Sequence, residues 1–215
     1  MTLPLAQFFT VWAFLGVNIA SPGPNVLNTI ATSMGSGRAA GMGSAIAVGA
    51  GVALWCVSMS MGMAALFAAI PVLETALTLV AAGLLFWFSQ RYLRVAWSAR
   101  HGGLALPRGA DGLDFATGFR RSLLVNVLNP KALASWLAIL TFFPVATASP
   151  ADIALLCAGA VGVAIALHSL YALVFSTPIA ARLYLRAGAV LSLGAGIFFS
   201  VFALRLVMEI LGGCG

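Results

Sequence analysis

Val17-Asn18-Ile19-Ala20-Ser21-Pro22 and Val125-Asn126-Val127-Leu128-Asn129-Pro130 align without a gap at an offset of 108 residues. Three of the six positions are identical, and two more are conservative, Ile with Val and Ser with Asn. Both stretches lie in long apolar segments where asparagine and proline are rare, so their alignment is informative. It indicates an internal repeat at half the chain length. Coincidence in an apolar sequence of low complexity is the alternative.

The composition around these stretches is that of a membrane protein. Of the 215 residues, 62% are hydrophobic and only 7% are charged, whereas a soluble domain carries about a quarter charged residues. So few charges could not cover a water-facing surface, which excludes a soluble enzyme, a nucleic-acid-binding protein and a disordered chain. The formal net charge of +6 comes without a basic domain, so nucleic acid is not expected as a partner.

Apolar runs separated by turn residues predict an all-α, multi-pass membrane protein with six transmembrane helices. The runs are 7–31, 41–66, 70–90, 120–144, 151–176 and 187–211. Each is long enough to cross a hydrocarbon core of about 30 Å. A five-span arrangement, with one apolar segment re-entrant rather than crossing, is the alternative.

The few charges lie mainly between these runs and predict the orientation of the chain. Nine arginines fall in the connections on one side: Arg38, Arg91, Arg94, Arg100, Arg108, Arg120, Arg121, Arg182 and Arg186. Glu74, Asp152 and Glu209 fall on the other side. Because basic loops stay in the cytoplasm, we expect both termini outside. The arginines then serve topology and solvation, with contact to anionic membrane lipid as the alternative.

One long hydrophilic connection divides the chain near its middle. We expect a single membrane domain, 1–215, with a first three-helix repeat at 1–90, a cytoplasmic linker at 91–119 and a second repeat at 120–215. Because each half crosses the membrane an odd number of times, the halves must insert with opposite orientations. This is the inverted-repeat plan of many secondary transporters.

Prolines interrupt the first and fourth apolar runs near their middles, at Pro22, Pro24 and Pro130. A proline has no N–H to donate to the carbonyl four residues earlier. The carbonyls released in this way are those of Asn18, Ala20 and Asn126. Such groups need a partner or a water-filled cavity within hydrocarbon. The prolines therefore predict two broken helices, 1 and 4, with ordinary kinks as the alternative.

Each break is expected to begin a new half-helix, capped by Ser21 or Asn129 with proline at the first position. In the inverted arrangement, the two N-terminal ends could converge on one anion. Lys131 is the only lysine and lies about 15 Å along the helix from Arg121. A buried cation usually faces a cavity or a partner. We expect it to contact a substrate carboxylate; pairing with carbonyls or acidic lipid is the alternative.

The remaining polar and small residues give weaker indications. His168 is a candidate proton relay, although a histidine in an apolar segment is more often bonded to a neighbouring helix. Glycines in the second and sixth runs favour close helix packing, with a homodimer contact as the alternative. Cys56, Cys157 and Cys214 have no paired spacing and are expected to be packing residues rather than disulfides or metal ligands. No motif for a metal or cofactor is visible.

Three motifs together resemble the LysE/RhtB family over nearly the whole chain. They are Ser21-Pro22-Gly23-Pro24-Asn25, the stretch Gly37-Arg38…Gly41…Gly49, and Asn126…Asn129-Pro130-Lys131-Ala132. The family comprises bacterial inner-membrane exporters of amino acids, their lactones and related small metabolites. The resemblance implies a multi-pass protein of the bacterial inner (plasma) membrane that is not an enzyme.

Two positions depart from the family pattern. Many relatives have an aspartate where this chain has Asn25, and Ser135 and Trp136 replace a common pair of phenylalanines. Without a membrane-embedded carboxylate at position 25, a strongly cationic substrate is not expected. Proton coupling also has no obvious carrier.

These observations predict secondary-active efflux of a neutral amino acid or a metabolite derived from one. Its candidate binding residues are Asn18, Ser21, Pro22, Gly23, Pro24, Asn25, Asn126, Asn129, Pro130 and Lys131. An exporter of another small solute or ion on the same fold, and a non-transporting membrane scaffold, are the alternatives. An intramembrane enzyme would need more catalytic polar groups at depth than Lys131 and His168 supply.

Overall fold

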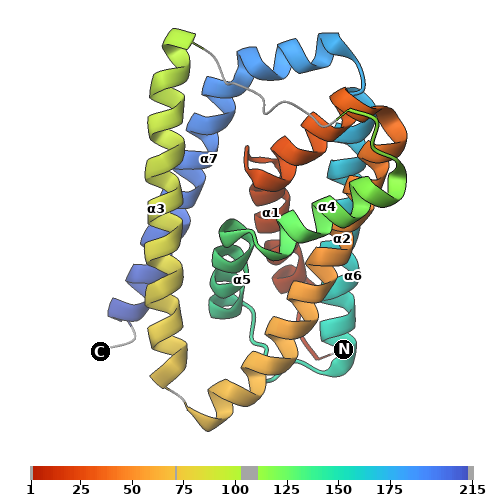
Figure 1. Ribbon diagram of the computed structural model, residues 1–215. Coiled ribbons are helices and arrows are strands. Elements are labelled where there is room, and N and C mark those ends of the chain that lie inside the picture. Colours follow the sequence, from red (N-terminus) through yellow and green to blue (C-terminus); the bar gives the residue numbers. More distant parts are fainter. Residues whose placement is uncertain (1, 71, 103–110, 213–215) are drawn as a thin grey trace.

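The computed structural model describes residues 2–70, 72–102 and 111–212, and its regular elements in these ranges are seven helices (Figure 1). They are α1 (Leu5–Ala20), α2 (Pro24–Ala69), α3 (Val72–Gly102), α4 (Phe115–Val127), α5 (Pro130–Phe142), α6 (Pro150–Val174) and α7 (Pro178–Gly212). The all-α prediction is therefore confirmed for the described part of the chain.

The number of spans differs from the six that were predicted. Four helical segments of the described chain are long and apolar enough to cross a membrane: 24–62, 75–98, 150–174 and 187–208. The α4–α5 pair, bent by 55°, makes a fifth if it counts as one span, whereas α1 has only 16 residues. The multi-pass prediction thus stands, while a count of six is not established.

The difference arises in the first two predicted spans. The first is divided where α1 ends at Ala20 and α2 begins at Pro24. The piece after this break then continues into the second predicted span without a separate connection. Non-helical angles at Gly37 (φ 79°, ψ −173°) bend α2 there. A positive φ of this kind is readily adopted by glycine alone.

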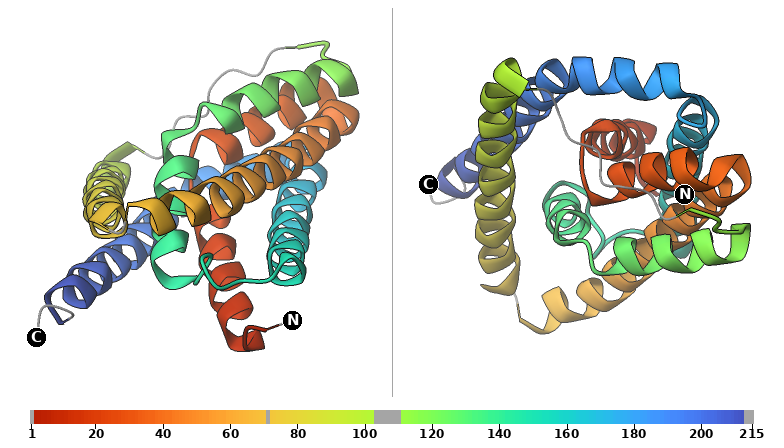
Figure 2. Two further views of the ribbon diagram at one scale, coloured as in Figure 1. Left: turned by 90° about the horizontal axis from the view of Figure 1, so that it is seen from below. Right: turned by 45° about the horizontal axis from the view of Figure 1, so that its top comes forward.

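Two short helices occupy the middle of the molecule. Figure 2 shows α1 and α5 inside a frame of the longer helices, of which α2 packs against α4 and α6, and α3 packs against α7. Every residue of α5 from Ala134 to Leu140 is buried. The first break and the second, between α4 and α5, are consequently held within the bundle.

Glycines allow the backbones of α2 and α4 to touch. A Cβ atom added at Gly118 would come 2.5 Å from the carbonyl oxygen of Ala40, and one at Gly43 would clash with the backbone of Phe115. Close approach of this kind is the packing that the glycines of the second run predict.

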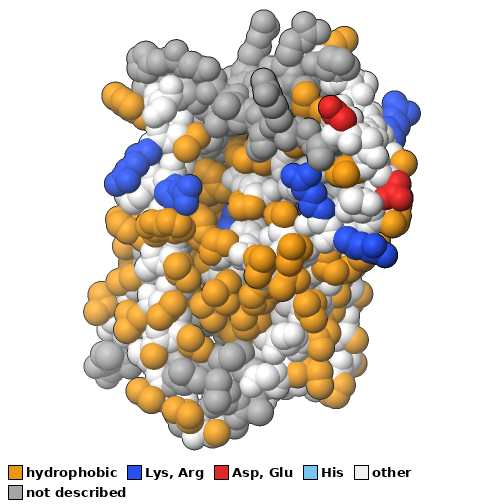
Figure 3. Space-filling view, in the orientation of Figure 1, with side chains coloured by type: hydrophobic (Ala, Val, Ile, Leu, Met, Phe, Trp, Pro, Cys, Tyr) orange, Lys and Arg blue, Asp and Glu red, His pale blue; other side chains and the backbone are white. Residues whose placement is uncertain are grey.

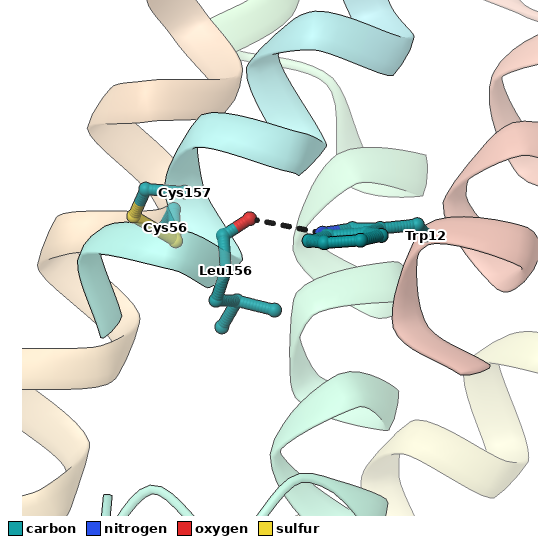
Figure 4. The surroundings of a disulfide bond; sticks show 4 residues. All are labelled: Trp12, Cys56, Leu156 and Cys157. Carbon is teal, nitrogen blue, oxygen red and sulfur yellow. Dashed lines mark hydrogen bonds between the residues drawn. A yellow bond between two sulfur atoms is a disulfide. The ribbon is translucent and has the colours of Figure 1, made fainter. Parts of the chain in front are cut away.

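The cysteines correct an expectation from the sequence. Cys56 of α2 and Cys157 of α6 form a disulfide, with their Cα atoms 5.8 Å apart (Figure 4). This separation is ordinary for a disulfide, but the residues lie 101 positions apart, so no local spacing reveals the pair. Beside it, Trp12 donates a hydrogen bond to the Leu156 carbonyl at 3.2 Å, which also joins α1 to α6. Cys214 lies outside the described residues.

Charged side chains gather in one half of the face drawn in Figure 3. In the face drawn in Figure 3, the Lys, Arg, Asp and Glu side chains lie in the upper half, and the lower half is mostly hydrophobic. Helix α3 continues to Gly102 and α4 begins at Phe115, so much of the expected linker at 91–119 is helical. Residues 103–110, with Arg108, lie outside the described residues.

Candidate functional site

The first break leaves α1 with carbonyl groups that have lost their helical donors. Ser21 is the C-cap of α1, and α2 starts at Pro24. The expectation that Ser21 caps the next helix is wrong, because the second of the two prolines takes the first helical position. Ser21 Oγ instead donates to the Asn18 carbonyl at 2.6 Å, and Tyr171 Oη donates to the Ala20 carbonyl at 3.0 Å.

The second break, between α4 and α5, has the expected cap. Asn129 is the N-cap of α5, its side chain accepts a hydrogen bond from the Lys131 backbone N–H at 3.0 Å, and Pro130 takes the first position. The Asn126 carbonyl accepts from the Asn129 N–H at 3.1 Å and from Trp55 Nε1 at 3.4 Å. The carbonyl that Pro130 releases is therefore satisfied by the Asn129 N–H and by a second donor from α2.

Lys131 connects the two breaks. Its side chain starts from the first turn of α5, is only 4% exposed, and reaches the end of α1. Nζ donates to the Asn18 carbonyl at 2.7 Å, the Ser21 carbonyl at 3.1 Å and Ser21 Oγ at 2.6 Å. It also lies 5.5 Å and 5.7 Å from the ring centroids of Tyr92 and Phe199. The cation thus sits at the negative end of a helix dipole with an acceptor for each of its three N–H groups.

Two cavities flank this lysine. The smaller, of about 40 Å³, has these polar lining residues: Asn18, Asn25, Asn126, Asn129, Ser135 and His168. The larger, of about 290 Å³, is lined mainly by apolar residues, with Arg91 and Tyr92 among the exceptions. Lys131, Gly23 and Asn129 border both. Lys131 therefore forms part of the wall between a polar space and a larger, mainly apolar one.

Gly23 and Tyr92 complete the surroundings of the lysine. A Cβ atom at Gly23 would lie 3.1 Å from Lys131 Nζ and 3.2 Å from its Cδ, so a larger residue would crowd the ammonium group. Tyr92 Oη donates to the Pro22 carbonyl and so satisfies a further polar group of the first break from α3.

Three polar atoms around the smaller cavity have no hydrogen-bond partner although they are buried. They are Asn25 Oδ1, Asn126 Oδ1 and His168 Nε2. Buried polar groups are nearly always satisfied, and unsatisfied ones often mark a site for water, an ion or a ligand. A cavity of this volume has room for about three water molecules. The site can therefore accept a small polar group.

The structure brings the predicted site residues together. The smaller cavity is bordered by Asn18, Gly23, Asn25, Asn126, Asn129 and Lys131, as well as His168. The larger is bordered by Pro22, Gly23, Pro24, Asn129, Pro130 and Lys131. Ser21 contacts Lys131 directly. The group from Asn18 to Asn25 and the group from Asn126 to Lys131 are 100 or more residues apart in the sequence but lie at one place in the bundle.

Other residues of the site were missed by sequence reasoning. Tyr92, Phe199, Trp55 and Tyr171 come from four different helices and have no motif around them. Ser135, noted only as a departure from a family pattern, accepts a hydrogen bond from Asn18 Nδ2 and donates to the Lys131 carbonyl at 2.6 Å. A serine four residues after the lysine, on the same helix face, was the one available signal.

The fold and site together define a multi-pass helical membrane protein with a buried cation between two broken helices. The chain belongs to the LysE type translocator family, whose sequence model matches residues 17–210, and this confirms the resemblance drawn from the motifs.

Two bacterial relatives support this placement. The chain is 34% identical over 132 residues to the uncharacterized membrane protein PA4757 of Pseudomonas aeruginosa, a match that covers 61% of each chain. It is 28% identical over 204 residues to the uncharacterized membrane protein YahN of Escherichia coli, covering 95% of this chain and 90% of that protein. The aligned region thus spans less than two thirds of the first relative. No solved structure gives a significant match.

Proposed function

We propose that this protein exports a neutral amino acid, or a small metabolite derived from one, by secondary-active transport across the bacterial inner membrane. The observation that carries the proposal is the buried ammonium group of Lys131, which joins the two helix breaks between two cavities. A carboxylate is the natural partner of such a cation.

The charges around the site favour a neutral side chain on the solute. The described residues lining the two cavities include Lys131 and Arg91 but no aspartate or glutamate. Asn25, which is neutral, borders the smaller cavity, so no carboxylate is present there to pair with a cationic side chain. A zwitterionic amino acid without a further charge suits this balance, whereas lysine or arginine would bring an unpaired cation.

Binding would require Lys131 to exchange partners. In the present conformation all three N–H groups of its ammonium are used by Asn18 and Ser21. A solute carboxylate that replaces these oxygens would release the end of α1 from α5. Since α1 and α5 lie in the middle of the bundle (Figure 2), the exchange would couple solute binding to movement of one broken helix against the other, which is what alternating access needs. The membrane potential or a proton gradient would supply the energy.

The proposal includes an inverted repeat, with halves 1–90 and 120–215 joined by 91–119. It is supported by helix breaks that follow the matched Asn18 and Asn126, with the aligned Pro22 inside the first break and Pro130 at the end of the second. It also includes an orientation with the arginine-rich end in the cytoplasm. Cysteine labelling of the linker tests the orientation: reaction with an impermeant reagent from outside intact cells would overturn it.

Resistance of cells to toxic neutral amino-acid analogues tests the function. A bacterium that produces the chain should tolerate at least one analogue better than cells producing Lys131→Ala at equal membrane abundance. Equal tolerance across the panel would reject the proposed site. Vesicles containing the wild-type chain that never exchange a labelled amino-acid pool would favour a scaffold instead.

Asn25→Asp tests the substrate class within the same assay. A carboxylate at this position should shift the preference toward cationic analogues, because it gives their side chain a partner. Asn25→Gln is the matched neutral control and should leave the order of preference unchanged. An unchanged substrate profile in Asn25→Asp would contradict the specificity argument.

A further inference from the structure

A chain of hydrogen bonds leads through the bundle to His168 and is not used by the proposal above. Asn28 Nδ2 donates to Ser122 Oγ at 2.6 Å, and Ser122 Oγ donates to Ser44 Oγ at 2.7 Å. Ser44 Oγ lies 2.8 Å from Thr29 Oγ1, which lies 2.8 Å from His168 Nδ1. All but Asn28 are buried, and together they join α2, α4 and α6.

The first donor sets the direction of the chain. An amide NH₂ group can only donate, so Ser122 accepts from Asn28 and gives its own single proton to Ser44. Ser44 can then give its proton to Thr29 Oγ1, and in that arrangement Thr29 has its own proton to donate to the imidazole. Nδ1 of His168 is then the acceptor. A neutral imidazole that accepts at one nitrogen carries its proton on the other.

The other ring nitrogen belongs to the site. His168 is 1% exposed and borders the smaller cavity, and its Nε2 has no hydrogen-bond partner. Its titratable neighbours are Tyr171 of the same helix, whose ring centroid lies 5.8 Å away, and Lys131 across the cavity. A donor beside a cation attracts oxygen acceptors. A carboxylate, with one carbon and two oxygens, occupies a space comparable to this cavity.

We propose that His168 is a solute-binding residue, held as the Nε2–H tautomer by the chain from Asn28, and that it donates to the carboxylate of the solute that Lys131 attracts. This rests on the proposed function. It assigns His168 a fixed proton, in contrast to the proton-relay role that the sequence also allowed.

The tautomer of His168 can be determined by ¹⁵N NMR, without any transport assay. The chain has two histidines, His101 and His168, so imidazole ¹⁵N labelling gives two assignable ring systems, identified with His101→Gln. The expected spectrum shows a proton on Nε2 and none on Nδ1 of His168. Thr29→Val, which removes the donor while keeping the side-chain shape, should bring Nδ1–H into the mixture. A wild-type protein with its proton on Nδ1 would overturn the proposal, because the hydrogen-bond chain would then run in the opposite direction.

Binding is tested in the same sample with a defined probe. An equimolar mixture of alanine, serine, valine and leucine should shift the Nε2–H resonance, and the corresponding amino-acid amides should not. An equal response to both mixtures would exclude carboxylate recognition. No response to either, together with exchange of these amino acids by wild-type vesicles, would overturn the binding role of His168 and leave the proposed function standing. No response and no exchange of any amino acid would reject both proposals.

Two substitutions separate a donor from a relay. His168→Gln places an amide donor near the position of Nε2, whereas the shorter His168→Asn reaches only the position of Nδ1. We expect Gln to bind the amino-acid mixture within about threefold of wild type and Asn to bind about tenfold to a hundredfold more weakly, the range for a lost hydrogen bond to a charged group. Equal loss in both variants at equal abundance would contradict the donor role.

Discussion

The two helix breaks begin from nearly the same six residues yet use their polar groups in opposite ways. After Asn18, the chain offers oxygen atoms, and a cation from another helix satisfies them. After Asn126, the chain forms an Asn129-capped helix start that carries this cation into the first break. The first break therefore supplies the hydrogen-bond acceptors, and the second supplies the donor, Lys131.

The matched asparagines show the same inequality. Asn18 Nδ2 donates to Ser135 and so joins α1 to α5. Asn126 Oδ1 has no hydrogen-bond partner and lies against the backbone of α2, where a Cβ at Gly51 would overlap it. The asparagine of the first copy stabilises the bundle, and the asparagine of the second leaves a free hydrogen-bond acceptor beside a cavity. A repeat in sequence thus produces a site with two different sides.

Lys131→Ala should have the largest effect, because it removes the donor side completely. Export should fall to the level of vesicles without protein. The Asn18 carbonyl would keep its bond from Ser21 Oγ, but the Ser21 carbonyl would lose the donor it has in Lys131. An unsatisfied buried group costs about 1–3 kcal/mol, so the thermal denaturation midpoint in detergent should fall. Lys131→Arg keeps the charge and is the matched control for stability. Full export by the alanine variant at equal abundance would remove the basis of the comparison.

The two asparagine-to-alanine variants should change different properties, stability in one and solute binding in the other. Asn18→Ala should lower the free energy of unfolding by about 1 kcal/mol, the usual contribution of one hydrogen bond. Asn126→Ala should change stability less and raise the solute concentration needed for half-maximal export. Denaturation in detergent and export kinetics, measured on both variants, test this. Indistinguishable variants would show that the two breaks are equivalent after all.

Ser21→Ala should affect stability and export less than Asn18→Ala or Asn126→Ala does. It removes one of the three acceptors of Lys131 and leaves both carbonyls in place. If the ammonium group must leave this break for transport to proceed, a weaker hold should preserve export or increase it slightly. Initial export rates at saturating solute give the answer, and a loss as severe as that of Lys131→Ala would contradict the exchange of partners.

Trp55→Phe should have the smallest effect. It removes a long hydrogen bond of 3.4 Å to the Asn126 carbonyl, which keeps the Asn129 N–H as a second donor. We expect a loss of stability below about 1 kcal/mol with export retained. A strong loss of export at normal abundance would mean that the second break depends on α2 more than its geometry indicates.

The features that could be predicted from the sequence are those that local chemistry dictates. Pro130 after Asn129 predicts a capped helix start, and the structure has it. Rare polar residues in apolar runs identified Lys131 and His168 as residues of interest. At the first break the same reasoning gave the wrong cap, because two prolines compete for the first helical position and Ser21 has a better partner in the carbonyl of Asn18.

Contacts between distant helices could not be predicted in this way. The pairing of Cys56 with Cys157 depends on how α2 packs against α6, and the hydroxyl of Tyr92 reaches Pro22 from a helix with no motif. Such contacts depend on packing that apolar helices with little periodicity do not encode locally. The count of six spans is not established for a related reason, since Gly37 bends α2 without ending it.

The single lysine allows the central claim to be tested directly. With ¹⁵N in the lysine side chain, the NMR spectrum of the protein has one Nζ signal, that of Lys131. If a solute carboxylate replaces the oxygens of Asn18 and Ser21, adding the amino-acid mixture should move this signal, and adding the amides should not. An Nζ signal that stays in place while vesicles containing the same protein export these amino acids would contradict the account.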